Sequence, residues 1–284
     1  MESVETKVKT IEAFTWIDFC TYFLLFCFAV RNVITYLVVQ KRWNMFYLTV
    51  FYVFVVLLSC SRTIYFFVFG YLLHDFDNNY SITLDKLLIT SSELSFSLKA
   101  IIGTFQVGQM LDLTVEMKSS VMILTEARSK TYKTVIKVAT SIVATFLLIA
   151  IGINLIYSFR WPDWSDKEIP PSIIRFYYYY TPCVLTSLSV LLTISTIYLL
   201  VLVNRHFKQV LKAEACKVRT IYVVFTIAYI SRAITSLIFS LKPPHSMNEF
   251  THGMTYLVMY NFWDVLPLSL IMSYHYSGFK TDNG

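Results

Sequence analysis

The stretch that decides the fold is MTYLVMYNFWDVLPLSLIMSYH, residues 254–275. It is long and apolar enough to cross a bilayer, which takes about 20 mostly apolar residues. Asp264 lies in its middle, where a carboxylate costs about 2.5–3.5 kcal/mol on the insertion scale unless another group answers the charge. Arg232 lies at a similar depth in the preceding apolar segment, 220–240. We therefore predict an ion pair between Arg232 and Asp264, and a helix bend at Pro267 one turn later.

The composition of the whole chain indicates a membrane protein. Of its 284 residues, 56% are hydrophobic and 15% are charged, whereas soluble domains carry about 25% charged residues. The 23 phenylalanines and 20 tyrosines suit lipid-facing and interfacial positions. The first apolar stretch is too long for the core of a signal peptide, so we expect the chain to begin with its own membrane anchor. A polytopic membrane protein is the class that these features favour.

Seven apolar segments of about 18 residues or more could each cross a bilayer. They cover residues 14–39, 45–73, 87–113, 135–157, 176–203, 220–240 and 254–272. The third contains Lys99 and other polar residues, and we retain it because polar side chains in membrane helices usually face the bundle interior. The sequence therefore predicts an all-α, seven-transmembrane-helix bundle as a single domain over residues 14–275. Short tails at residues 1–13 and 276–284 complete the predicted chain.

Basic residues predict the orientation of this bundle. Of the 24 lysines and arginines, seven fall in the N-terminal tail and in the connections after the second, fourth and sixth spans, and four lie within spans. The other thirteen fall on the opposite side, which the positive-inside rule assigns to the cytosol. We therefore predict a lumenal or outside N-terminus and a cytosolic C-terminus. A sequon begins at Asn79 on the predicted outer side, which makes Asn79 a candidate glycosylation site.

An internal repeat accompanies the buried charges. The segment YVFVVLLSCSRTI ends shortly after Arg62, and YVVFTIAYISRAI ends shortly after Arg232. An acid follows each arginine at nearly the same spacing, Glu93 in the first case and Asp264 in the second. We therefore predict a second pair, Arg62 with Glu93, because either charge alone would be stranded in a low-dielectric bundle. Both pairs are interpreted as structural staples, with a conformational switch as the alternative.

Two further charged residues and two basic connections are candidates for function. Asp18 near the outer face and Lys99 near mid-depth could line a polar cavity with Glu93. The basic cytosolic loops at residues 114–134 and 204–219 reflect topology and contact with anionic lipid, and a cytosolic protein partner there is the alternative. The net charge of +6 does not indicate nucleic-acid binding. No cysteine or histidine spacing predicts a metal, a disulfide or a cofactor.

The positions of the charged residues resemble those of a known family. The motifs are Arg62 in the second span, Glu93 in the third, SRAITSLIF around Arg232 and WDVLPLSLIM around Asp264. They resemble the THH/TOM-like, or tobamovirus-multiplication-like, family of seven-transmembrane proteins. The sequence departs from that family in having Asp264 where glutamate is usual, and in lacking the proline that often follows the acid of the third span. The resemblance implies a receptor-like protein of the plasma membrane or of a vacuolar or lysosomal membrane, and some members recruit cytosolic factors.

The sequence favours a receptor-like or scaffolding membrane protein that senses a ligand or recruits cytosolic factors. The alternative is a small-solute or proton-coupled transporter or channel that uses Glu93, Lys99 and Asp264, since parallel repeats also occur in transporters. The predicted topology is GPCR-like, but the D/E-R-Y and N-P-x-x-Y motifs of G-protein-coupled receptors are missing. An enzyme is not predicted, because no nucleophile with a nearby base stands out.

Overall fold

A computed structural model describes residues 4–39, 46–74, 82–160, 171–206, 212–241 and 257–281. In these ranges the chain forms α1 (Val4–Val33), α2 (Phe46–His74), α3 (Ile82–Ser120), α4 (Glu126–Arg160), α5 (Pro171–His206), α6 (Lys212–Leu241) and α8 (Leu266–Thr281). Two π-helical segments continue them: η1 (Ile34–Val39) follows α1, and η3 (Asn261–Val265) leads directly into α8. The prediction of an all-α fold is confirmed.

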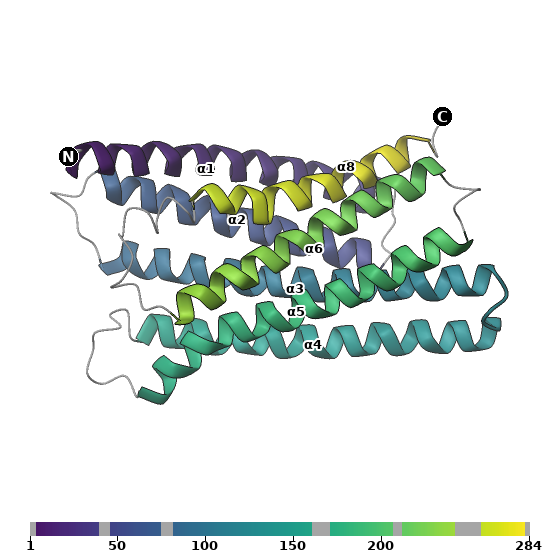
Figure 1. The fold of residues 1–284 in the computed structure, drawn as a ribbon. Helices are drawn as coiled ribbons and strands as arrows, with labels where there is room; N and C mark the ends of the chain where they lie inside the picture. The colour runs from purple at the N-terminus through teal and green to yellow at the C-terminus, as the bar shows by residue number, and fades with distance from the viewer. Residues whose placement is uncertain are drawn as a thin grey trace.

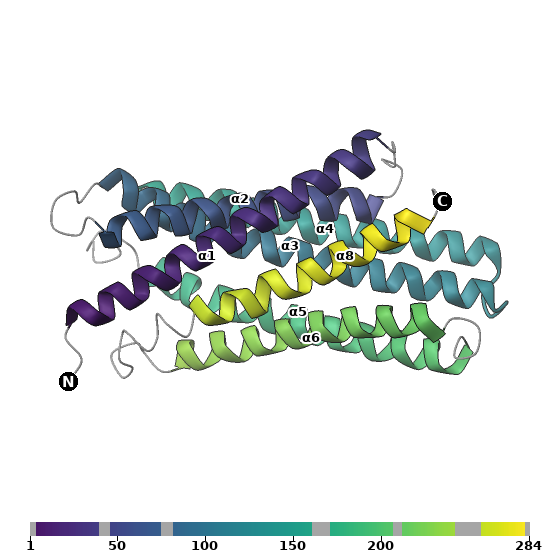
Figure 2. The ribbon, with the colours of Figure 1, turned by 90° about the horizontal axis from the view of Figure 1, so that it is seen from above.

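The helices run side by side along one axis, and successive helices point in opposite directions (Figure 1). The helix α3 lies in the middle and packs against α2, α4 and α5. The helix α8 lies between α1 and α6 and contacts both (Figure 2). Residues 121–125 connect α3 to α4 at one end of the bundle, which we call the turn end. The start of α1 lies at the opposite end, and α8 finishes at the turn end (Figure 1).

Five helical stretches are long and apolar enough to cross a membrane, among the residues that the structure describes. They are Val8–Val39, Phe46–His74, Glu126–Ile153, Tyr180–Arg205 and Val218–Ile238. On α4 the outward side chains include Val138, Phe146 and Ile149, each more than half exposed. Water-soluble proteins rarely leave so continuous an apolar face uncovered. The chain is therefore an integral membrane protein that meets the lipid bilayer through these faces.

The helices expected as the third and seventh spans, α3 and η3–α8, are less apolar than these five. In α3, residues 95–106 are all buried, including Lys99 and Gln106. The polar side chains of this part of α3 therefore face other helices rather than lipid, as polar residues inside a membrane bundle usually do.

Several boundaries differ from those that the hydropathy pattern predicts. The helix α1 begins at Val4, so most of the predicted tail 1–13 is helical, and α8 continues to Thr281. The predicted loop 114–134 is reduced to residues 121–125, because α3 runs to Ser120 and α4 starts at Glu126. The sequence there is rich in good helix formers such as Glu, Lys, Ala and Arg, which extend a helix beyond its apolar part. Hydropathy marks the apolar core of a helix and not its ends.

The side chain of Tyr229 on α6 packs against the backbone of α3 at a glycine. A Cβ atom on Gly103 would lie 2.7 Å from the hydroxyl oxygen of Tyr229. That hydroxyl donates a hydrogen bond of 2.7 Å to the backbone oxygen of Lys99, one turn earlier on α3. A glycine is needed here because a larger side chain would overlap the buried ring of Tyr229.

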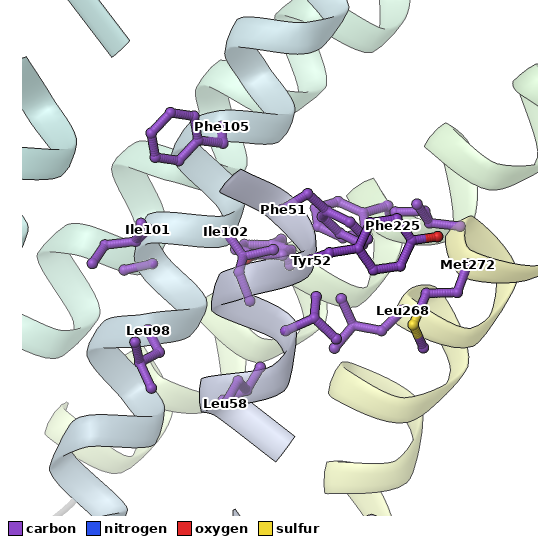
Figure 3. Packing of buried hydrophobic residues seen from close by; sticks show 14 of the residues in the cluster. Phe51, Tyr52, Leu58, Leu98, Ile101, Ile102, Phe105, Phe225, Leu268 and Met272 are labelled. Carbon is purple, nitrogen blue, oxygen red and sulfur yellow. The ribbon is translucent and has the colours of Figure 1, made fainter. Parts of the chain in front are cut away.

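Aromatic and aliphatic side chains from three helices fill the centre of the bundle. We call Phe51 and Tyr52 of α2, Phe225 of α6, and Leu268 and Met272 of α8 the apolar layer. All five are fully or almost fully buried. Figure 3 shows them packed together beside the side chains of α3. The apolar layer divides the interior of the bundle into two parts along its axis.

Candidate functional site

The carboxylate of Asp264 on η3 is fully buried and is shared by cations from three helices. Lys99 of α3 and Arg232 of α6 both donate to Oδ1, and the arginine Nη1 lies 2.8 Å away. The Nε atom of Arg62 on α2 lies 3.6 Å from Oδ2. We call Arg62, Lys99, Arg232 and Asp264 the charge cluster. The charge cluster connects α2, α3 and α6 to one carboxylate on η3, the segment that leads into α8.

Aromatic residues complete the surroundings of the charge cluster. The Tyr22 hydroxyl of α1 donates to Asp264 Oδ2 over 3.0 Å, so a fourth helix is tied to the same carboxylate. The Arg62 guanidinium lies 4.3 Å from the ring centroid of Tyr260. The Arg232 guanidinium lies 5.5 Å from the ring centroid of Trp263. Both are cation–π contacts, which gain strength where water is excluded.

Local helix geometry explains how Lys99 reaches this site. Pro267 has no amide hydrogen, so it cannot donate to the carbonyl of Trp263, four residues earlier, as an α-helical residue would. The chain forms the π-helical segment η3 here, and Leu266 donates to the carbonyl of Asn261. The ammonium of Lys99 donates to the Trp263 carbonyl and to Asp264. Pro267 therefore opens a backbone acceptor beside the buried carboxylate.

The structure places the predicted ion pairs as follows. Arg232 and Asp264 are in direct contact, as they were paired from the sequence. Arg62 contacts the same Asp264. The side chain of its predicted partner Glu93 is outside the described part of the chain, although its backbone belongs to α3. The two arginines of the repeat therefore converge on a single carboxylate.

The two residues predicted to line a polar cavity have separate surroundings. Lys99 is bound to Asp264 and lines a space of only about 10 Å³. Asp18, on α1, is buried and accepts a hydrogen bond from the side-chain amide of Asn261. Its Oδ2 atom has no hydrogen-bond partner among the described groups. None of the four best-formed cavities among the described residues has both Asp18 and Lys99 in its lining, and the outer candidate Asn79 falls outside the described ranges.

A cavity adjoins the charge cluster on the side away from the turn end. Its volume is about 150 Å³, and we call it the arginine cavity. Both cluster arginines contribute to its wall, and the lining consists of Arg62, Ser92, Phe96, Thr181, Leu185, Arg232, Ser236, Tyr260 and Trp263. Two guanidinium groups facing one small space create a site that attracts negative charge.

A larger cavity of about 430 Å³ opens at the turn end, and we call it the vestibule. Polar groups in its lining include Gln106, Asp112 and Glu116 of α3, Lys137 of α4 and Tyr222 of α6. The apolar layer lies between the vestibule and the charge cluster, as the order of residues along α2, α6 and α8 requires. The interior thus holds, in sequence, the arginine cavity, the charge cluster, the apolar layer and the vestibule.

Sequence reasoning missed several residues of this site. Tyr22 follows Asp18 by four residues, a spacing that puts both on one helix face, and this is the signal that could have revealed it. Tyr260 and Trp263 lie within one turn of Asp264 and could have been found in the same way. Tyr229 carries no such signal, because its role depends on the close approach at Gly103.

The described residues contain no group of three or more His, Cys, Asp or Glu side chains that could hold a metal ion. No protein-family model, curated protein or solved structure matches the chain. The charge cluster and the two cavities beside it are therefore the features that bear on function.

Proposed function

We propose that the chain is a receptor-like protein with seven transmembrane helices, in which the charge cluster couples a ligand site in the arginine cavity to the vestibule. The observation that carries this proposal is that Asp264 is shared by Lys99, Arg62 and Arg232, which come from three helices and lie between two cavities. A ligand that competes for one arginine would weaken that helix's tie to η3, and this differential contact is what a conformational response requires.

The lengths of the two less apolar helices support seven spans. The 39 residues of α3 extend about 58 Å at 1.5 Å per residue, almost twice the thickness of the hydrocarbon core. The helix runs alongside α4 for most of its length (Figure 1). The helical residues 257–281, which include η3 and α8, extend about 37 Å, which also exceeds the hydrocarbon core. We include both helices as the third and seventh spans.

The charge distribution supports a cytosolic turn end and a lumenal or outside start of α1. Arg128, Lys130 and Lys133 begin α4 at the turn end, where positive charge favours the cytosolic face. The connection between α3 and α4 also exposes Met122, which is 94% accessible and has a φ of 58°. The proposed docking region for a cytosolic protein is residues 114–134 and 204–219, of which 207–211 lie outside the described ranges. The membrane in question is the plasma membrane or an endomembrane.

The proposed coupling between the arginine cavity and the vestibule can be tested by measuring whether α6 moves relative to α3 at the turn end. Cys216 of α6 is exposed, and a cysteine replacing exposed Ser120 on α3 supplies a second spin-label site once the other four native cysteines are changed to serine. Arg232→Gln removes the tie between α6 and Asp264. It should therefore shift the distribution of distances between the two spin labels, measured by double electron–electron resonance. The control Arg128→Gln removes an exposed arginine outside the charge cluster and should leave it unchanged. Identical distributions for Arg232→Gln and the parent would count against the receptor proposal.

Transport is the second candidate function, favoured by the direct contact of Lys99 with Asp264 in the bundle core. Paired ionisable groups at such depth often belong to proton or solute paths. Vesicles reconstituted with the purified chain and a trapped pH dye would reveal proton-coupled flux. Flux that disappears with Glu93→Gln or Asp264→Asn, and survives the vestibule change Asp112→Asn, would favour a transporter over a receptor.

A further inference from the structure

We infer that the arginine cavity binds a small carboxylate with an apolar body, whose carboxylate lies between Arg62 and Arg232. This inference rests on the proposed function, because it names the class of ligand for the same site. Its evidence consists of the charge balance of the cluster, an unused donor on Arg62, and the size and walls of the cavity.

The charge balance comes first. The charge cluster holds three cations, Arg62, Lys99 and Arg232, around the single carboxylate of Asp264. A second described carboxylate, Asp18, accepts a hydrogen bond from the uncharged amide of Asn261, so three cations still outnumber two carboxylates. Isolated charges are costly in a low-dielectric interior unless an opposite charge is near. The described side chains therefore leave positive charge in excess, and an additional anion would stabilise the arrangement.

The second observation is a buried donor that has no acceptor. Arg62 is only 1% exposed, and its Nη1 atom has no hydrogen-bond partner among the described groups. The same side chain forms part of the wall of the arginine cavity, together with Arg232. A guanidinium presents a planar fork of donors that matches the two oxygens of a carboxylate. A ligand carboxylate in the arginine cavity would supply the missing acceptor and meet a second arginine.

The third observation is the shape and chemistry of the cavity. Its volume is about 150 Å³, a size at which an engineered protein cavity accommodates benzene. Phe96, Leu185 and Trp263 form the apolar part of the wall and are themselves buried, and the rest of the lining is polar, with hydroxyl groups beside the two arginines. An inorganic anion would use the arginines and hydroxyl groups but would leave the three apolar side chains without a partner. A carboxylate attached to about six apolar atoms uses both the arginines and the apolar walls.

Benzoate is the probe that fits this description, and it can be tested on the purified full chain in lipid nanodiscs. Titration calorimetry with benzoate, benzamide and acetate separates the contributions of charge and apolar body. We expect benzoate to bind, benzamide to bind about tenfold more weakly or worse because it lacks the charge, and acetate to bind more weakly than benzoate because it lacks the body. This comparison needs no variant, so it does not depend on the folding of one.

Filling the cavity provides the matched variant test. Ser92 lines the arginine cavity on α3, whereas Ser120 lies at the exposed far end of the same helix. Ser92→Phe should abolish benzoate binding, and Ser120→Phe should leave it unchanged. Glu93→Gln removes the carboxylate of the residue that follows Ser92 in the sequence, without changing the described lining, and benzoate affinity should stay equal or rise because the chain then carries one negative charge fewer.

The inference is overturned if benzoate does not bind the parent chain, if benzamide binds as tightly as benzoate, or if Ser92→Phe retains the affinity. Binding that occurs only in Glu93→Gln also overturns it, because the anion at the arginines would then belong to the chain itself. The spin-label distances separate this inference from the proposed function. Benzoate that binds without moving α6 supports the ligand class and contradicts the coupling. If Arg232→Gln shifts the spin-label distances but benzoate does not bind the parent chain, only the proposed ligand class is contradicted.

Discussion

Lys99 on α3 donates to the backbone carbonyl of Trp263 and to the carboxylate of Asp264, the next residue in the chain. The first of these bonds depends on Pro267, which removes the amide hydrogen that an α-helix would direct at the Trp263 carbonyl. The contacts of this single lysine therefore depend on both the backbone geometry and the charge of η3. Helix shape and charge placement are coupled at this position.

This coupling predicts non-additive stability changes for positions 99 and 267. Lys99→Met should lower the free energy of unfolding substantially in the parent chain, because it removes both bonds. In a Pro267→Ala background the same change should cost less, since the alanine amide competes for the Trp263 carbonyl. We expect a coupling energy of about 0.5–3 kcal/mol from a double-mutant cycle of denaturant titrations in detergent. If the changes in the free energy of unfolding were strictly additive, the contribution of Lys99 would not depend on Pro267.

The tyrosine that ties α1 to Asp264 should contribute measurably to stability. Tyr22→Phe keeps the stacking on Phe66, with ring centroids 5.4 Å apart, and removes only the hydroxyl that donates to Asp264. We expect a loss of about 1–3 kcal/mol, because the hydrogen bond is buried and its acceptor is charged. The melting temperature of the purified chain measures the effect. Tyr71→Phe, at an exposed tyrosine near the end of α2, is the matched control and should be neutral.

The close approach at Gly103 predicts a large effect for a small substitution. A Cβ atom there would lie between 2.7 and 2.9 Å from three atoms of the buried Tyr229 side chain. Gly103→Ala should therefore destabilise the chain by about 1–3 kcal/mol through overpacking. Gly152→Ala on α4 is the matched control, because a Cβ there meets nothing within 4 Å. It should be neutral or slightly stabilising, since alanine favours a helix over glycine. Equal effects at the two glycines would contradict the described packing.

Glycosylation at Asn79 tests the proposed orientation. If the connection between α2 and α3 is lumenal, the chain expressed in eukaryotic cells should shift in gel mobility after glycosidase treatment, and Asn79→Gln should abolish that shift. A sequon introduced into residues 121–125, at the proposed cytosolic end, should remain unmodified. Modification of the introduced sequon and not of Asn79 would reverse the orientation.

The positions of charged residues within the apolar segments predict one part of the site, the contact between Arg232 and Asp264. The depth of Arg232 and Asp264 follows from their place within two successive apolar segments, and their contact needs little beyond that. The position of Arg62 on the same carboxylate does not follow, because spacing along the chain fixes the depth of a residue and not the direction in which its helix face points. The role of Lys99 depends on the opening of the backbone at Pro267, a local geometry that hydropathy does not encode.

The fold shows the same division between what patterns predict and what packing decides. Apolar runs locate the helices well, because burial in lipid is set by composition over about 20 residues. They place the helix ends poorly, as in α3, which continues to Ser120 through polar residues that remain good helix formers. The polar composition of α3 does not by itself predict its central position. That position follows from the neighbouring helices that cover it (Figure 2).

Asp264 is the common partner of three cations and not one half of a simple pair. The direct measurement is the free energy of unfolding of Asp264→Asn, Arg232→Gln and the double variant, each in detergent. A shared carboxylate predicts that Asp264→Asn is the more damaging single change, by about 3–5 kcal/mol relative to the parent. It also predicts that adding Arg232→Gln recovers only part of that loss, because Lys99 and Arg62 still lack their anion. Equal single effects with full recovery in the double variant would contradict the claim and indicate an isolated pair.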